Sequence, residues 1–462
     1  VTQDVAYQSL LVQRRKELHR LIGVAIEELY ADRLAEQYEV LAYHFSKGEE
    51  QSKALEYFLK AGDKAAQAFA NREARALYEQ ALGLLGEENQ TRRAEVLKKL
   101  ATLAQYLGDA DASLRYAESA VELYEKLGDK RNAVAMHLHI QVLYTWQWDG
   151  AREDMGLKHL EAAAALVEDD PDSVEKALVY QRTGHLYLHR CQPPTTLAWA
   201  GKAVDMLGRL GVTMGTSLGT ALTYSGRIDE GVAYSEKNWE PVLKAAIPVV
   251  MAVMGHELSL TLALGRDVPR ATEWGERVLP EVVKASPVFE AMLRRPLALI
   301  YTLAGEVSKA EEACQAVERI EGKTLLGCIY EDAAGIGFHY LRRGEWEKAR
   351  DYLERAIPLY EERSNLSALC ACSLILGSLY LETGNLPRAE ELLLKSLDIS
   401  RSNVLVELWV LPVICDLYLK RGQHAGAAEH VKRGFELLKP DQNWYALPAP
   451  MFLAKGMLAT VV

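Results

Sequence analysis

The chain has 462 residues, of which 49% are hydrophobic and 25% charged, and its 64 acidic and 53 basic side chains give a formal net charge of −11. Because nucleic-acid affinity depends on Lys and Arg, this acidic balance argues against nucleic acid as the main partner. The length exceeds what one globular core supports, yet no Pro/Gly/Ser-rich linker divides the chain. Neither a signal peptide nor an apolar run long enough to span a bilayer is visible, so we expect a cytoplasmic protein with no membrane partner.

Residues 1–33 are predicted to form a short helical segment ahead of the main part of the chain. A basic cluster lies on one helix of this segment and consists of Arg14, Arg15, Lys16 and Arg20. Such a cluster is more typical of a solvated helix face, or of a contact with a neighbouring domain, than of nucleic-acid binding. Since the sequence begins at Val1 without a methionine, we expect it to be a fragment of a longer protein.

Small residues recur at a near-constant spacing through the rest of the chain, and each begins a stretch typical of the second helix of a hairpin. From Ala74 onward most steps are 38 to 40 residues, with one of 35 and one of 43. This period predicts a stacked repeat array. The eleven positions are Ala54, Ala74, Ser113, Gly156, Thr196, Gly231, Ala271, Ala310, Ala349, Ala389 and Ala427.

The repeat unit is clearest near the C-terminus. Two antiparallel helices approach closely only where both carry small side chains, and Gly337 and Ala349 are expected to form such a contact. Tyr340 and Leu353 would fill the space beside it, and Gly344 after the first helix permits a left-handed cap. Strand signals are poor throughout, so we predict an all-α fold.

Small, large and glycine positions in this order resemble the tetratricopeptide repeat over residues 34–440. The resemblance implies a superhelix, or α-solenoid, of about eleven helical hairpins whose first helices line a concave surface. Residues 441–462 look like the first helix of a further repeat. The pattern is irregular at Trp146 and Trp148, which either fill a gap or anchor a ligand, and at Arg294, which replaces an apolar residue.

The opening stretch from Val1 to His19 closely resembles the junction that follows the ATPase module in bacterial signalling ATPases of the STAND type. In those proteins a winged-helix element ends here and a tetratricopeptide array follows. Many carry a class III adenylate or guanylate cyclase domain and others a transcription-factor domain, and the maltose-regulon activator is a structural cousin. The resemblance implies a sensor or scaffold arm that regulates an attached ATPase or cyclase absent from this chain.

Catalytic and metal-binding signals are weak. His185 and His189 have a spacing that can hold a metal, but no third ligand is evident, and His137 and His139 point to different helix faces. The run from Gly215 to Gly219 lacks the lysine and the preceding strand of a phosphate loop. The six cysteines are scattered and fit reduced structural thiols. We therefore predict no catalytic residue, no metal and no cofactor.

The concave surface is the remaining candidate site. Four threonines and a tyrosine in one repeat predict a hydroxyl-rich strip able to hydrogen-bond a peptide backbone or a sugar-like effector, although threonine also merely tolerates a half-exposed helix face. The candidate binding residues are Gln181, His185, His189, Thr213, Thr216, Thr220, Thr223, Tyr224, Arg295, Thr302, Glu331, Phe338 and Arg342.

Two functions fit this surface, and an enzyme is the weakest alternative. The first is an interaction module that binds a protein or peptide in an open groove. The second is a sensor that binds a small-molecule effector in a closed pocket, as in regulators of the maltose-activator type. If the array is a receptor, replacing Thr220 and Arg295 by Ala should weaken binding of the partner or effector and leave the thermal midpoint nearly unchanged.

Overall fold

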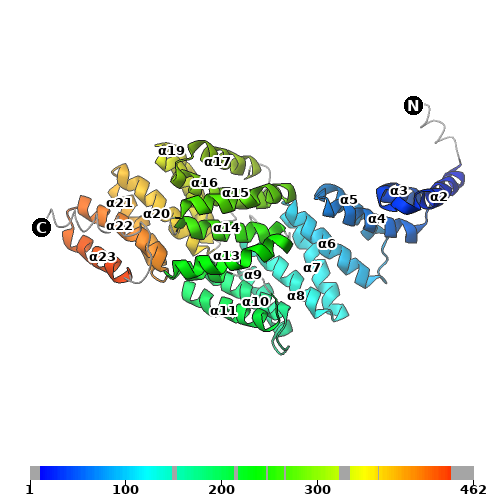
Figure 1. Ribbon diagram of the computed structural model, residues 1–462, viewed down its shortest axis with the longest axis horizontal. Coiled ribbons are helices and arrows are strands. Elements are labelled where there is room, and N and C mark those ends of the chain that lie inside the picture. Colours follow the sequence, from blue (N-terminus) through cyan, green and yellow to red (C-terminus); the bar gives the residue numbers. More distant parts are fainter. Residues whose placement is uncertain are drawn as a thin grey trace. The chain divides into compact units, whose positions relative to one another are not determined.

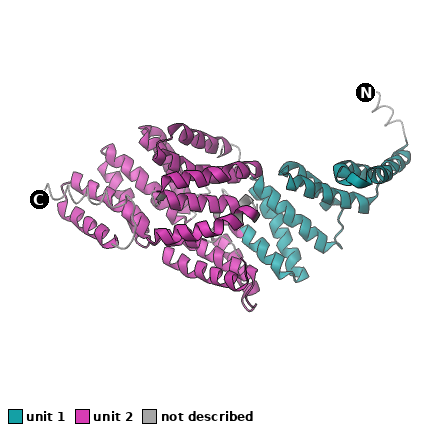
Figure 2. Cartoon of the chain, in the orientation of Figure 1, with its two compact units in different colours: residues 1–140 teal, residues 141–462 magenta. Residues whose placement is uncertain are grey.

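The chain is all helical wherever the computed structural model describes it, which is residues 11–147, 153–212, 217–245, 248–264, 267–321, 333–362 and 364–438 (Figure 1). It divides into two compact units, Val1–Ile140 and Gln141–Val462 (Figure 2). The boundary falls inside one helix, α8. Each unit is described by itself below.

Unit 1 is a stack of antiparallel helices in which each α-helix from α2 to α7 packs on the next. Helix α4, for example, contacts both α3 and α5. Tyr78 and Phe45 are buried here against glycines, because a Cβ on Gly62 or Gly23 would come within 2.7 or 2.8 Å of their rings. The helices are α2 (Val12–Leu29), η1 (Ala31–Gln37), α3 (Tyr38–Lys47), α4 (Gln51–Gln67), α5 (Asn71–Leu84), α6 (Gln90–Tyr106), α7 (Ala110–Leu127) and α8 (Lys130–Val142).

Unit 2 continues with successive helical hairpins, of which α10 with α11 is the first well-defined pair and α22 with α23 the last. The elements are η2 (Leu143–Gln147), α9 (Glu153–Val167), α10 (Val174–His189), α11 (Pro193–Arg209), α12 (Leu218–Tyr224), α13 (Ile228–Ala245), α14 (Pro248–Leu264), α15 (Val268–Ala285), α16 (Pro287–Ala304), α17 (Val307–Glu321), α18 (Ala333–Arg342), α19 (Trp346–Glu362), α20 (Leu366–Glu382), α21 (Leu386–Ser400), α22 (Val404–Lys420) and α23 (His424–Leu437).

Small residues set the helix contacts, as the sequence predicts. All eleven of the recurring small positions are buried, and each lies in a different helix. Gly219 and Gly231 bring α12 and α13 closest, since a Cβ on Gly231 would come within 2.5 Å of the carbonyl oxygen of Gly219. Leu353, which is expected to fill the space beside Gly337, lies against it, since a Cβ on Gly337 would come within 2.6 Å of Leu353 Cδ2. Gly344 has the expected positive φ of 74° after α18.

The helices of unit 2 also meet across a long sequence separation, at a contact that we call the seam. Leu188, Tyr224 and Ile228 from the α10–α13 part form one buried cluster with Leu405 and Leu408 of α22. Val232 of α13 packs against this cluster, and Figure 1 shows α22 beside α13. Helix α10 likewise contacts α20, and α12 contacts α22. The first helices of distant hairpins therefore cover one another's inner faces.

Hydrogen bonds fix the register of the seam. The Ser402 hydroxyl donates to the carbonyl oxygen of Cys191 at 2.6 Å, and Asn403 Nδ2 lies 3.6 Å from Cys191 Sγ. Asn403 is fully buried, and its Oδ1 accepts from the amide of Val406, which caps α22. A buried side chain that caps a helix and also contacts a distant turn specifies one docking position.

We expect Gly337→Leu to lower the free energy of unfolding by about 1–3 kcal/mol, because overpacking a tight helix contact forces the neighbours apart. The added side chain would meet Leu353 Cδ2, which lies only 2.6 Å from a Cβ at this position. Urea denaturation of the full chain measures the change. Gly201→Leu in α11 is the matched control, since a Cβ there meets no atom within 4 Å. Equal destabilisation by both substitutions would contradict the packing argument.

Candidate functional site

The predicted binding residues that the structure describes all lie on first helices of hairpins in unit 2. Thr213, Thr216 and Glu331 lie outside the described residues. Helix α10 carries Gln181, His185 and His189, α12 carries Thr220, Thr223 and Tyr224, α16 carries Arg295 and Thr302, and α18 carries Phe338 and Arg342.

These residues do not form an open, hydroxyl-rich strip. Of the ten, Arg342 alone is exposed. The Thr223 hydroxyl is fully buried and donates to the carbonyl oxygen of Gly219, one turn back, at 3.1 Å. The Thr302 hydroxyl likewise donates to the carbonyl oxygen of Ala298, one turn back, at 2.7 Å. Threonine in a helix often forms this bond, and it removes the donor that a ligand would need.

Four of the predicted residues line a small buried cavity. His185, His189, Thr220 and Tyr224 line it together with His256 and Glu257 of α14, and its volume is about 20 Å³. We call His185, His189, Thr220, His256 and Glu257 the inner cluster. That volume is close to what one water molecule needs, so the cavity as it stands is too small for a sugar or a peptide.

The inner cluster gathers three imidazoles around one carboxylate. Glu257 Oε2 lies 3.4 Å from the Thr220 hydroxyl and Oε1 lies 3.8 Å from His185 Nδ1. The His185 and His189 rings stack with centroids 4.8 Å apart. Burial holds the pKa of His185 well below 6.5, and nearby His189, Arg182 and His256 lower it further. His185 is therefore neutral at physiological pH. Among the described residues no group of three or more His, Cys, Asp or Glu side chains is arranged to hold a metal.

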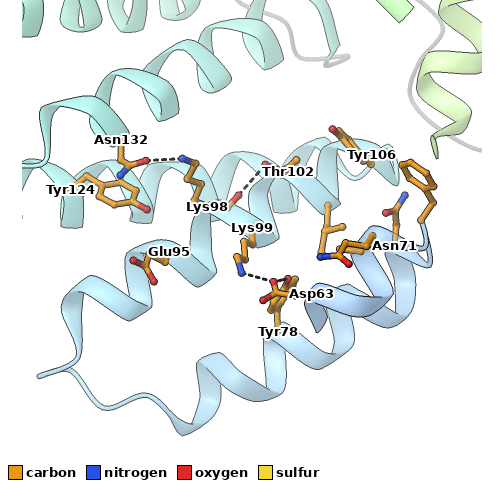
Figure 3. Close-up of a pocket in the computed structure, with 14 residues that line it drawn as sticks. Asp63, Asn71, Tyr78, Glu95, Lys98, Lys99, Thr102, Tyr106, Tyr124 and Asn132 are labelled. Atoms are coloured by element: carbon orange, nitrogen blue, oxygen red, sulfur yellow. Dashed lines mark hydrogen bonds and ion pairs between the residues drawn. The ribbon is translucent and has the colours of Figure 1, made fainter. Parts of the chain in front are cut away.

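A larger hollow lies in unit 1, where the sequence interpretation placed no binding residue. Its volume is about 580 Å³, and Figure 3 shows its walls from α4 to the start of α8. We call it the unit 1 groove. Its lining residues are Asp63, Ala66, Gln67, Phe69, Asn71, Tyr78, Glu95, Lys98, Lys99, Thr102, Leu103, Tyr106, Tyr124 and Asn132.

One face of α6 supplies the polar floor of the unit 1 groove. Glu95, Lys98, Lys99, Thr102 and Tyr106 follow one another at helical spacing, and all five line the hollow. That spacing is visible in the sequence and was the available signal. It is easily missed, because charged residues at such positions usually mark a solvated face.

The two lysines of the unit 1 groove differ in their partners. Lys99 Nζ pairs with Asp63 Oδ1 at 2.5 Å, and the Tyr78 hydroxyl donates to the same oxygen. Lys98 Nζ donates to a neutral group, the amide oxygen of Asn132, at 2.6 Å (Figure 3). Burial lowers the pKa of Lys98, and Arg131 lowers it further, although Asp129 and Glu95 oppose the shift. Lys98 thus presents a half-buried ammonium that no carboxylate of the described residues contacts directly.

The other candidates from the sequence have structural partners. The basic cluster on α2 is paired at the surface, as in Lys16 with Glu49 at 2.6 Å and Arg14 with Glu17 at 2.6 Å. His137 Nε2 lies 3.0 Å from Glu125 Oε1, and His139 Nε2 lies 2.8 Å from the Ser113 hydroxyl. The irregular Arg294 pairs with Glu290 at 2.7 Å.

The remaining sequence candidates are buried thiols or lie outside the described residues. Cys191, Cys314, Cys370, Cys372 and Cys415 are buried thiols that form no disulfide with one another. Burial raises the pKa of Cys314, Cys370 and Cys415 to about 12, so these thiols are unreactive. Cys328, Trp148, Gly215 and the side chain of Trp146 belong to the part of the chain that is not described.

Comparison with known proteins shows the fold. The tetratricopeptide repeat family matches residues 325–402, which include α18 to α21. Among solved structures, the APC/C hetero-tetramer Cut9-Hcn1 aligns with a TM-score of 0.50 at 15% identity and covers 98% of this chain and 90% of its own. The predicted fold class, an all-α tetratricopeptide-repeat solenoid, is confirmed.

Two further structures match at lower similarity. A Rap protein complexed with competence and sporulation factor has a TM-score of 0.41 at 14% identity, covering 88% of this chain and 99% of that one. Yeast Tom70 has a TM-score of 0.35 at 12% identity, covering 93% and 97%. No curated protein sequence matches the chain. The matched family is a repeat family and not a catalytic one, and no described helix is long and apolar enough to cross a membrane.

The burial of Arg295 overturns the expectation that replacing it by Ala leaves the stability of the chain unchanged. Because Arg295 is only 3% exposed, truncating it should lower the free energy of unfolding by about 3 kcal/mol instead of leaving the thermal midpoint unchanged. Arg342→Ala is the matched control, because Arg342 is exposed and its loss should change stability by less than about 0.5 kcal/mol. Urea denaturation of both variants compares them, and equal midpoints would contradict the buried environment of Arg295.

Proposed function

We propose that the chain is a non-catalytic protein-interaction region that binds an extended segment of a partner protein in the unit 1 groove. The observation that carries the proposal is the contrast between two inner surfaces. The groove offers about 580 Å³, whereas the inner cluster of unit 2 encloses about 20 Å³ beneath the seam. Peptide recognition requires an accessible channel that spans several helices, and the groove is lined by five of them.

The chemistry of the groove fits a polypeptide that carries an acidic group. Thr102 and Gln67 offer groups that can hydrogen-bond a main chain, and Tyr106 and Phe69 offer aromatic surface. Lys98 supplies the charge preference. An anion beside its ammonium would replace the hydration that burial removes, and this would favour a carboxylate or phosphate on the partner.

The wider role that we propose for the chain is based on the resemblance of residues 1–19 to the junction that follows the ATPase module in STAND-type proteins. We infer a cytoplasmic bacterial signalling protein of the STAND type, in which this region regulates an attached ATPase or nucleotide cyclase. Residues 1–33 would be the junction, 34–440 the repeat array and 441–462 the first helix of a further repeat. The inner residues His185, Thr220, Arg295 and their predicted companions would act in unit 2 only after the inner surface opens.

A small-molecule effector is the second candidate. The unit 1 groove has a volume of about 580 Å³, within the range of about 300–1,000 Å³ that is usual for small-molecule sites. A sugar-like ligand would use the hydroxyl and amide groups of the groove and would gain little from Lys98. The two candidates therefore differ in how they depend on this lysine.

We expect Lys98→Gln to weaken binding of acidic peptides about tenfold, because a charge-assisted hydrogen bond is lost while the amide can still reach Asn132. Peptides selected from a random display library on the full chain provide the ligands, and fluorescence anisotropy measures their affinity. Lys99→Gln is the matched control and should change affinity less than about threefold, because Lys99 is exposed and already paired with Asp63.

Three outcomes separate the candidates. Selection of acidic peptides that lose affinity in Lys98→Gln supports the proposal. Selection of peptides without acidic groups, bound equally by both variants, would contradict the role of Lys98. Binding of saccharides with no peptide selected would favour the small-molecule effector.

A further inference from the structure

The seam differs in kind from the other helix contacts of unit 2. It joins Cys191 to Ser402, which are 211 residues apart, whereas the hairpin contacts join neighbouring helices. In a repeat array the stability is close to a sum of terms within repeats and between neighbours. Opening the seam therefore leaves the neighbouring interfaces intact and requires only the seam's own contacts to break.

The contacts of the seam are few and well defined. The buried cluster holds five side chains, Leu188, Tyr224, Ile228, Leu405 and Leu408. Two polar contacts from Ser402 and Asn403 to Cys191 add to it, and partly buried side chains such as Val232 and Trp409 pack around it. A small set of contacts that can break without unfolding the elements on either side is the requirement for a local opening transition.

The seam and the inner cluster share side chains. Leu188 and Tyr224 belong to the seam and also line the cavity that holds His185, His189, Thr220, His256 and Glu257. Helix α10 thus carries His185 and His189, which line the cavity, and Leu188, which lines the cavity and also belongs to the seam. When the seam separates, Leu405 and Leu408 of α22 leave Leu188 and Tyr224, so water reaches the side chains that form this wall of the cavity.

An additional positive charge is unfavourable in the closed cavity because it is buried and lies near other basic side chains. A proton on His185 would lie among Arg182 and His189 of α10 and His256 of α14, and Glu257 is the carboxylate among the residues that line the cavity. The other lining residues carry no charge and are Leu188, Thr220, Tyr224, Val253, Leu260 and Met292. In the open state water solvates the imidazolium, so protonation favours opening.

We propose that the seam of unit 2 is a proton-sensitive closure, shut while His185 is neutral and opened when His185 is protonated. The direction follows from linkage. His185 has a lowered pKa when the seam is closed, so the closed state is fully favoured above about pH 6.5, the ordinary value, and loses stability as the pH falls below it. This inference is independent of the unit 1 groove.

Hydrogen exchange of the full wild-type chain tests the proposal, followed by mass spectrometry. At about pH 5.5, peptides over residues 186–192, 222–230 and 402–410 should exchange about tenfold faster than at about pH 7.5, after correction for the intrinsic pH dependence of amide exchange. Peptides from α15 and α19 should not change. A uniform rise that includes α15 and α19 would indicate acid unfolding and overturn the proposal.

Matched variants identify the histidine that takes up the proton. His185→Gln should remove the pH dependence of exchange at the seam, and His256→Gln should reduce it. His430→Gln is the control, because burial also lowers the pKa of His430 but it stacks on Tyr418 away from the cavity, and the pH dependence should persist. Leu405→Ala should speed exchange at both pH values and so show that these peptides report the seam. If His185→Gln and His256→Gln both keep the wild-type pH dependence, the proposal is wrong.

Discussion

Two antiparallel helices can approach only as closely as the side chains between them allow, and this steric limit governs the whole fold. Small residues at the crossing points let each hairpin close. The extreme case is α12 and α13, where Gly219 and Gly231 face each other and a single added Cβ would meet a carbonyl oxygen at 2.5 Å. Because every hairpin uses the same kind of contact, large side chains are pushed to either side of it, where they fill the space between neighbours.

Under the same steric limit the inner surfaces of the two units differ in character, one being open and polar and the other covered by a neighbouring helix. In unit 1 the exposed face of α6 carries lysines, a threonine and a tyrosine, and a hollow remains between the helices. In unit 2 the inner faces of α10 and α12 carry side chains such as Leu188 and Tyr224, which meet α22. Polar groups caught beneath that contact, such as His185 and Glu257, must then find partners within the protein, because water is excluded.

The spacing of residues in the sequence predicted the fold well. It predicted the surroundings of the candidate binding residues much less well. The recurring small residues depend on contacts within one hairpin, so their spacing is readable from the chain alone. The burial of Thr220 and Arg295 depends on helices brought together from far along the sequence, and no periodic pattern reports that. The same holds for Cys191 and Asn403, which are unremarkable in the sequence and yet meet in the structure. Lys98 was readable in principle, but only burial distinguishes it from Lys99.

The seam also bears on how many repeats unit 2 can contain. An open array can gain or lose a hairpin, because each repeat needs only its neighbours, and families of such arrays vary in length by this route. In unit 2 the turn at Cys191 must lie opposite Ser402 for their hydrogen bond to form. The number of hairpins between α10 and α22 is therefore fixed. Duplication or deletion of one of them would shift the register and leave the apolar faces of Leu405 and Leu408 without their partners. We expect variation in repeat number among relatives to be confined to segments outside α10–α22.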